Sequence, residues 1–533
     1  MLLSRSCSWL LAGLLTLPAL AQTGPPVTAP LDVAAVDAVV VRALKAFDVP
    51  GMAVAVVKDG QVVLAKGYGV SSLKNKAPVD ANTLFGIASN TKAFTAAALG
   101  LLVDEGKLRW DDKVTAYIPE FQLYDPYVTA EFTVRDLLTH RSGLSAGAGD
   151  LLLRYPDSTN FSTQEVLHNL RYIKPVSSFR SQYAYNNSLY LVAGEVVARV
   201  AKQPWTTFVE TRLLQPLGMR RSAASFARLP DPTNVAEAHT PVEGRVQVLR
   251  RELESTTDLT GALLSAGGIY SSANDLSQWV RMLLGGPGAP PPLLKPATQR
   301  ELWTPQTLLP VSTWPLPYPT HFAAYGLGWR LNDVRGYQQV WHTGGNPGMV
   351  SQVTLLPELH LGIVVLTNQA NRGAYTAVTN QIEDHYLGVT GLDRVQELVD
   401  PANVLIAAEA QRTAAVWQQV ATAQQAAPKR PDHAPYRGRY HDALFGDMSV
   451  YEQGAQLWLK AARSPRLMGQ LLPYRGHTFV VRWNDRSINA AFTLFSLDAQ
   501  GQATAFKLSN IAGPRNIFQD LDLQRVSETP SGK

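Results

Sequence analysis

The stretch that decides the fold is Ser89-Asn90-Thr91-Lys92, which stands where a long apolar helix is expected to begin. The residues before it are loop-like, and those after it are rich in Ala, Leu and Phe until Glu105-Gly106, a typical helix end. Positions three apart on a helix share a face, so the Ser89 hydroxyl and the Lys92 amine can meet without help from the rest of the chain. Because an adjacent amine can activate a serine hydroxyl, the two residues are a candidate nucleophile and base.

A second match to the same S-x-x-K spacing, Ser71-Ser72-Leu73-Lys74, has a different context. It lies among turn-like residues after an expected strand, and no helix pattern follows it. So short a pattern also arises by chance in a chain of this size. We therefore interpret the second match as a solvated loop and favour Ser89.

Composition excludes several classes of protein. The 533 residues are too many for one ordinary core, which predicts two or three domains. The formal net charge is +5 and the basic residues are scattered, so we expect no nucleic-acid partner. The ten histidines include no H-E-x-x-H or H-x-H pattern, so we expect neither a metal site nor a cofactor.

The first 21 residues have the pattern of a signal peptide. Arg5 supplies a positive start, an apolar segment too short to span a bilayer follows, and Ala19-Leu20-Ala21 is a small-x-small cleavage site. Cys7, the only cysteine, lies inside this segment, so the mature chain would have neither a thiol nor a disulfide. We expect export to the periplasm or the medium, and no later stretch is apolar enough to span a membrane.

The segment 22–400 has strand patterns at both ends and helix patterns between them. A helix is expected at 31–48, followed by a hairpin that turns at Asp59-Gly60. The ten prolines in 287–319 predict an irregular surface excursion. Strands are then expected at 339–341, 349–356 and 361–367. This order predicts an α+β fold, an antiparallel sheet flanked by helices with an inserted all-helical subdomain.

The remainder of the chain has a different periodicity. Residues 401–431 are predicted to be a helical linker, because they are rich in Ala and Gln and end in a Pro-Lys-Arg-Pro run. From 432 to 533 the apolar residues alternate with polar ones between turn signals. This pattern predicts a small all-β domain, a barrel or a sandwich.

Two further motifs carry chemistry. Tyr185-Asn186-Asn187 is the only Y-x-N in the chain, and a helix pattern follows it. His342-Thr343-Gly344-Gly345 stands at the end of one expected strand and before the next. Either motif alone is more often structural, since tyrosine and histidine commonly complete an apolar core.

The order S-x-x-K, Y-x-N, H-T-G resembles the penicillin-recognising serine hydrolases. The likeness is greatest to the β-lactamase-related branch (peptidase S12-like), which includes class C β-lactamases, D-aminopeptidases, DD-carboxypeptidases and some esterases. It covers about residues 35–390 and is supported by Leu137–Leu144, Gly267–Ser272 and Tyr325–Trp329. More weakly, the tail around Tyr436–Tyr440 resembles the lipocalin-like domain attached to some of these hydrolases.

This resemblance implies catalytic roles for three of the residues. Ser89 would attack a carbonyl group and become acylated, and Lys92 would take part in removing its proton. Tyr185 would pass a proton to the leaving group. A free lysine is charged at neutral pH, so Lys92 needs a lowered pKa to act as a base. Whether Lys92 or Tyr185 is the general base stays open.

The resemblance also implies the substrate-binding residues. Asn187 would orient the substrate or Lys92, while His342, Thr343 and Gly344 would line the cleft. The backbone N–H groups of Ser89 and Gly345 would form the oxyanion hole, the donors that stabilise a developing negative charge.

The third motif has His342 where penicillin-binding proteins commonly have lysine. Because histidine is only partly charged at neutral pH, this favours an aminopeptidase or esterase over a β-lactamase or a DD-carboxypeptidase proper. The expected partner is a small-molecule or peptide substrate, and the oligomeric state is open.

Two rival interpretations remain. Gly143-Leu144-Ser145-Ala146-Gly147 matches the G-x-S-x-G nucleophile elbow, but a helix pattern with an N-cap threonine precedes it where the elbow needs a strand. The second rival is a catalytically inactive receptor for peptidoglycan fragments or β-lactams, with the β domain as its recognition part. The presence of all three motifs disfavours it.

Overall fold

The computed structural model describes residues 29–153, 161–242, 244–249, 263–311, 317–426, 432–486, 488–512 and 516–526. The expected signal peptide with Cys7 and the end of the expected linker, 427–431, lie outside these ranges.

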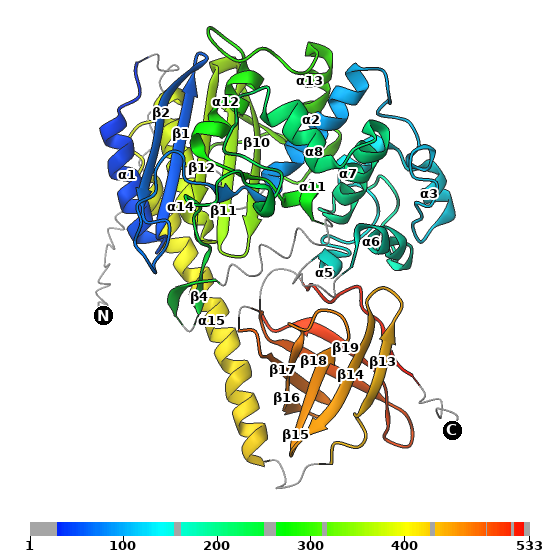
Figure 1. The fold of residues 1–533 in the computed structure, drawn as a ribbon. Coiled ribbons are helices and arrows are strands. Elements are labelled where there is room, and N and C mark those ends of the chain that lie inside the picture. Colours follow the sequence, from blue (N-terminus) through cyan, green and yellow to red (C-terminus); the bar gives the residue numbers. More distant parts are fainter. Residues whose placement is uncertain are drawn as a thin grey trace, which may run out of the picture.

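The centre of the larger body is an eight-stranded antiparallel sheet in the order β2-β1-β12-β11-β10-β9-β8-β7 (Figure 1). The N-terminal hairpin pairs with the last strand, since Met52 of β1 lies opposite Thr367 of β12. Asp59 and Gly60 both have positive φ, as a two-residue I′ turn requires. The sheet is thus built from both ends of the segment, as predicted. Its strands are β1 Gly51–Lys58, β2 Gln61–Gly69, β7 Thr307–Leu309, β8 Ala323–Tyr325, β9 Arg330–Val334, β10 Tyr337–Asn346, β11 Met349–Leu356 and β12 Leu361–Thr367.

Helices cover both faces of this sheet. Alternate residues of β1 enter different cores, so Val54 and Val56 pack with α1 Val33–Ala46 and α14 Arg372–Leu387. Ala53 and Ala55 belong to the other core, with α2 Thr91–Asp104 and α12 Ala273–Leu284. Burial on both faces explains why β1 is apolar throughout.

The inserted subdomain between β2 and β7, predicted to be all-helical, is mainly helical. Two short strand pairs interrupt it, β3 Phe85–Gly86 with β6 Tyr270–Ser271 and β4 His239–Val242 with β5 Arg245–Val248. Its further helices are α3 Pro126–Glu131, α4 Val134–Leu138, α5 Asp150–Leu153, α6 Thr163–Asn169, α7 Ser188–Ala201, α8 Trp205–Val209, α11 Leu264–Gly267 and α13 Pro296–Leu302.

Two expectations need correction. The proline-rich stretch contains α13 and the edge strand β7, because proline is well suited to the first helical position, which Pro296 occupies. The strand expected at 339–341 extends through the third motif to Asn346, where Gly344 pairs with Ser351 of β11. The sequence pattern did not predict this extension, because Gly344 and Gly345 have little intrinsic preference for strands.

The C-terminal body is a closed eight-stranded barrel, which decides between the two predicted all-β forms (Figure 1). Aromatic rings fill its interior, with centroids 4.8 Å apart for Tyr440 and Phe506 and 5.3 Å for Phe495 and Phe506. The long helix α15 Arg394–Ala426 packs Val420 against its outer wall. The strands are β13 Gly438–Asp442, β14 Gly446–Gln453, β15 Gln456–Ala461, β16 Met468–Arg475, β17 Thr478–Trp483, β18 Ala491–Leu497, β19 Ala503–Asn510 and β20 Leu523–Arg525.

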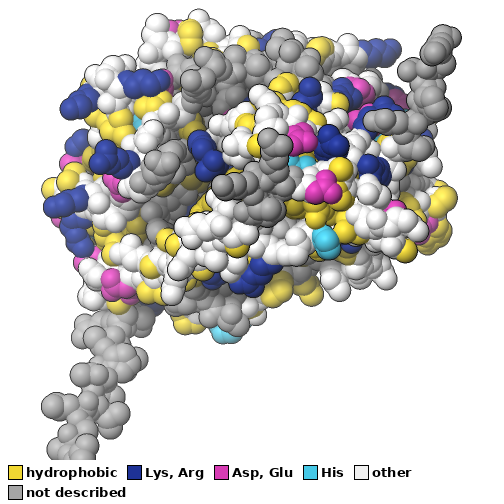
Figure 2. All heavy atoms as spheres, turned by 90° about the horizontal axis from the view of Figure 1, so that it is seen from below, with side chains coloured by type: hydrophobic (Ala, Val, Ile, Leu, Met, Phe, Trp, Pro, Cys, Tyr) yellow, Lys and Arg dark blue, Asp and Glu magenta, His cyan; other side chains and the backbone are white. Residues whose placement is uncertain are grey.

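The surface agrees with the scattered charge of the sequence. On the face drawn in Figure 2, Lys and Arg side chains are dispersed among acidic, polar and apolar groups. Among the described residues, no helix has both the length and the apolar character needed to cross a bilayer.

Candidate active site

Ser89 lies in a 3-10 turn, Ala88–Asn90, that leads directly into α2. The Lys92 Nζ lies 3.1 Å from the Ser89 Oγ, so one helical turn brings the pair together as predicted. Ala88 has φ 48°, a left-handed conformation that costs energy for a residue with a side chain and that often occurs at functional sites. Ser89 is partly exposed whereas Lys92 is fully buried, so the hydroxyl can meet a substrate while the amine is shielded from water.

Two fixed acceptors hold the Lys92 amine. Its Nζ donates to Asn187 Oδ1 and to the Ala266 carbonyl, each at 2.8 Å. The Tyr185 ring centroid lies 4.9 Å from Nζ. Burial lowers the pKa of Lys92 to about 7, and the Asp150 carboxylate acts in the opposite direction. In the folded chain Lys92 therefore has the lowered pKa that a lysine needs in order to act as a base.

Asp150 is a residue that sequence reasoning missed. It begins α5, is buried, and accepts a hydrogen bond of 2.9 Å from Asn187 Nδ2. A carboxylate only accepts, so this bond orients the Asn187 amide and directs its oxygen at Lys92. The two residues are 37 positions apart without any periodic relation, so no sequence signal marked Asp150.

The Tyr185 phenol completes one side of the cluster. Burial raises its pKa well above the usual range, and an interaction with the Ser89 hydroxyl acts against that rise. The phenol therefore keeps its proton at neutral pH. Its ring also lies 4.3 Å from that of His140, whose Nδ1 accepts from the Asn186 N–H at 3.1 Å. His140 had only marked the family resemblance, and the structure shows that it supports the backbone of the Y-x-N motif.

His342 is buried beside the cluster, and its ring centroid is 6.3 Å from that of Tyr185. Its Nδ1 lies 2.7 Å from the Thr343 carbonyl, which only accepts, so Nδ1 carries the proton. Its Nε2, 3.0 Å from the Tyr325 hydroxyl, then accepts from that phenol. Burial, aided by the charges of Lys92 and Arg330, holds the pKa of His342 well below its usual range. His342 is thus a neutral residue near pH 7.

The two other strand residues predicted to bind substrate face opposite ways. A Cβ on Gly344 would lie 2.0 Å from the Ile87 carbonyl, so this position directly faces the Ser89 turn. The Thr343 side chain instead interacts with Tyr375 of α14, on the other face of the sheet. Thr343 therefore reaches the cluster only through its backbone. Gly345, the predicted oxyanion donor, is exposed at the end of the same strand.

Asn90 fixes the serine turn to this strand. In the amide orientation that satisfies its neighbours, Asn90 donates to the His342 carbonyl at 3.0 Å and accepts from the Gly344 N–H at 3.3 Å. Ser351 of β11 adds a bond of 2.7 Å to the Ile87 carbonyl. Asn90, the residue that follows Ser89, is thus part of the support for the site.

The comparison with known families agrees with this geometry. A family model described as Beta-lactamase matches residues 36–387. The chain belongs to the β-lactamase family. A second model, described as a domain of unknown function (DUF3471), matches residues 423–525 of this β-lactamase-family chain.

Several curated relatives are similar to the chain. It is 27% identical over 452 residues to the unguisins hydrolase ungD of Aspergillus violaceofuscus, with 80% of this chain and 77% of the relative covered. It is 30% identical to the unguisins hydrolase ungD′ of Aspergillus campestris, with 66% and 65% covered. Protein flp of Staphylococcus aureus is 27% identical, with 62% of each chain covered.

Solved structures show the same fold. The octameric penicillin-binding protein homologue from Pyrococcus abyssi has a TM-score of 0.59 and 22% identity, with 92% of this chain and all of that chain covered. The D-amino acid amidase from Ochrobactrum anthropi has a TM-score of 0.52 and 22% identity, with 69% and 99% covered.

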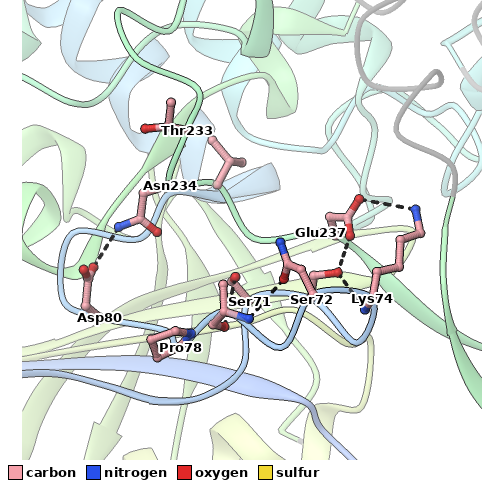
Figure 3. Close-up of a pocket in the computed structure, with 11 residues that line it drawn as sticks. Ser71, Ser72, Lys74, Pro78, Asp80, Thr233, Asn234 and Glu237 are labelled. Atoms are coloured by element: carbon pink, nitrogen blue, oxygen red, sulfur yellow. Dashed lines mark hydrogen bonds and ion pairs between the residues drawn. The ribbon is translucent and has the colours of Figure 1, made fainter.

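The second S-x-x-K match lies elsewhere in this β-lactamase-family fold. Ser71 and Lys74 line a separate polar hollow of about 460 Å³ (Figure 3). There Lys74 lies 3.5 Å from a carboxylate oxygen of Glu237, while the Ser71 hydroxyl donates to the Ala77 carbonyl. Ser71 is buried rather than solvated, which corrects that part of the expectation.

Ser145, the serine of the G-x-S-x-G pattern, follows the short helix α4 rather than a strand. Thr133 is the predicted N-cap threonine of that helix, and it forms a capping box with Asp136. Within the described ranges, no group of three or more His, Cys, Asp or Glu side chains is arranged to hold a metal ion.

Proposed function

We propose that the chain is a serine hydrolase that cleaves an amide or ester through an acyl-enzyme on Ser89. The observation that carries the proposal is the 3.1 Å contact between the Ser89 Oγ and a buried lysine whose pKa is about 7. A lysine with that pKa is neutral in about half of the molecules at pH 7, compared with well under one in a thousand for an exposed one.

Hydrogen bonding around Lys92 supports its role as the base. A neutral amine has two N–H groups and one lone pair. The Asn187 Oδ1 and the Ala266 carbonyl can only accept, so they take both N–H groups. The lone pair is then directed at the third neighbour, the Ser89 hydroxyl. In the acylation step, Ser89 Oγ forms a bond to the substrate carbonyl carbon while its proton moves to Lys92 Nζ.

Tyr185 is suited to the opposite task. Its pKa is raised, so the phenol is protonated and can donate to the leaving nitrogen or oxygen as that bond breaks. The proton taken by Lys92 can then restore the phenol, and water releases the acyl group from Ser89. The N–H groups of Ser89 and Gly345 would hold the negative charge on the substrate oxygen.

The substrate class follows from His342. A neutral imidazole offers no fixed positive charge for a substrate carboxylate. This supports an aminopeptidase, amidase or esterase, and relatives carry the names hydrolase and D-amino acid amidase.

Arg330 supports a second candidate, a β-lactamase or DD-carboxypeptidase. Its charge acts on both Tyr185 and His342, and its guanidinium lies 3.0 Å from the Tyr183 hydroxyl. A carboxylate-bearing substrate could pair with this cation instead of with a lysine in the third motif. A substrate panel with and without a free carboxylate, run on the wild type and on Arg330→Gln, separates the two candidates.

A fluorescent phosphonate probe tests the proposal itself. Labelling that is lost in Ser89→Ala supports an active serine hydrolase. An unlabelled, folded wild type would instead favour the inactive receptor.

We also propose export, with cleavage near Ala21, and a division into the hydrolase domain 22–400, the linker 401–431 and the barrel domain 432–533. N-terminal sequencing of protein secreted by a bacterial host tests the cleavage site.

A further inference from the structure

The barrel contacts the helical subdomain near α5 (Figure 1). The contact runs between residues 516–522, which connect β19 to β20, and the loop 145–150 of the helical subdomain. Gln519 Nε2 donates to the Ser145 Oγ at 3.0 Å and to the Ala146 carbonyl at 2.9 Å. Asp520 Oδ2 accepts from the Gly149 N–H at 3.0 Å.

The opposite side of the 145–150 loop is bonded to the Y-x-N motif. The Gly147 N–H donates to the Tyr185 carbonyl at 2.7 Å, and Asn186 Nδ2 donates to the Ala148 carbonyl at 2.9 Å. The loop ends at Asp150, which orients the Asn187 amide. Each residue of the Y-x-N motif is therefore hydrogen-bonded to the 145–150 loop, and the barrel contacts the other side of that loop.

The barrel presents its two contact residues from an anchored segment. Phe518 and Leu521, on either side of them, are buried. The Asp522 N–H adds a bond of 2.6 Å to Asp442 Oδ2, at the end of β13. These contacts fix the segment that carries Gln519 and Asp520 to the barrel.

We propose that Gln519 and Asp520 are positioning residues, which act through the 145–150 loop to hold Tyr185 and Asn187 in their reactive places. This inference rests on the proposed function, because it assigns the barrel a role in the same site. A displacement of about 1 Å in a reacting group can cost about 100-fold in rate, so loss of this contact need not unfold the protein to matter.

The test compares full-length variants on a p-nitrophenyl ester. Asp520→Ala removes the acceptor for Gly149, and we expect kcat to fall by about 10–100-fold with little change in KM. The acid limb of the pH profile should also move to lower pH, because Asp150 raises the pKa of Lys92 and would no longer be held beside it. Asp520→Asn retains an acceptor oxygen and should recover most of the activity.

A second variant and a matched control keep the test decisive. Gln519 is exposed, so Gln519→Ala leaves the core intact and should still lower kcat. Arg463→Ala breaks another contact between the two domains, the 2.8 Å ion pair with Glu165, and should not affect the rate. Thermal unfolding confirms that each variant is folded.

Four outcomes are distinct. Loss of kcat with a shifted limb in Asp520→Ala and lower kcat in Gln519→Ala, with Arg463→Ala unaffected, supports the inference. Wild-type rates in the Asp520 and Gln519 variants overturn it. Equal losses of kcat in Asp520→Ala, Gln519→Ala and Arg463→Ala, without a shift of the acid limb, also overturn it. Such a result would show that weakening any contact between the two domains has the same effect. A wild type that neither hydrolyses the ester nor labels at Ser89 overturns the proposed function itself.

Discussion

Acidification from pH 8 to pH 5 is the perturbation that most directly tests the role of Lys92. Its pKa of about 7 makes the amine about nine-tenths neutral at pH 8 and about one-hundredth neutral at pH 5. If the neutral amine removes the serine proton, kcat/KM on a p-nitrophenyl ester should fall by about 100-fold over this range. The shift from 10.5 to about 7 corresponds to roughly 5 kcal/mol, the net of burial, which disfavours the ammonium form, and the Asp150 carboxylate, which favours it.

The assay measures kcat/KM at half-unit intervals, with Ser89→Ala as the blank for spontaneous hydrolysis and circular dichroism as the check on folding. Asp150→Asn is the matched variant, because an amide oxygen can still accept from Asn187 while the negative charge is gone. Since that charge raises the pKa of Lys92, its removal should move the acid limb to lower pH. An acid limb near pH 10, as for an exposed lysine, would refute the reasoning. An acid limb that moves to higher pH in Asp150→Asn would also refute it.

Three further predictions follow from the same geometry. Ser89→Ala should lower ester hydrolysis by about 10³-fold or more with an unchanged unfolding temperature, and retained activity in that variant would end the assignment of the nucleophile. A chromogenic cephalosporin should be turned over slowly, because His342 is neutral; rapid turnover measured by absorbance would contradict this and favour Arg330 as the carboxylate site. Gly344→Ala should lower the free energy of unfolding, measured by urea titration, by about 1–3 kcal/mol, because the new Cβ would lie 2.0 Å from the Ile87 carbonyl oxygen. The control is Gly345→Ala, because the nearest atom to its new Cβ would be 4.0 Å away.

Local patterns in the sequence predicted a large part of the fold and one contact of the site. The hairpin at Asp59-Gly60 and the apolar run of β12 depend on residues close together in the chain, where turn chemistry and periodicity are informative. The pair of Ser89 and Lys92 is local for the same reason, since one helical turn brings the two groups together. The extension of β10 through Gly344 was missed because its pairing with Ser351 depends on a partner strand and not on strand propensity.

The chemical state of the site is a product of the tertiary structure. Lys92 has the same side chain in any context, and its pKa falls to about 7 only because packing excludes water around it. Asp150 becomes relevant when α5 places it against Asn187, and Asp520 when the barrel docks on the 145–150 loop. The sequence by itself thus determined which groups can react and where the main elements form, because those depend on short-range geometry. Burial, charge and the support of the barrel were decided by the folded chain, because they arise from contacts between residues far apart in sequence.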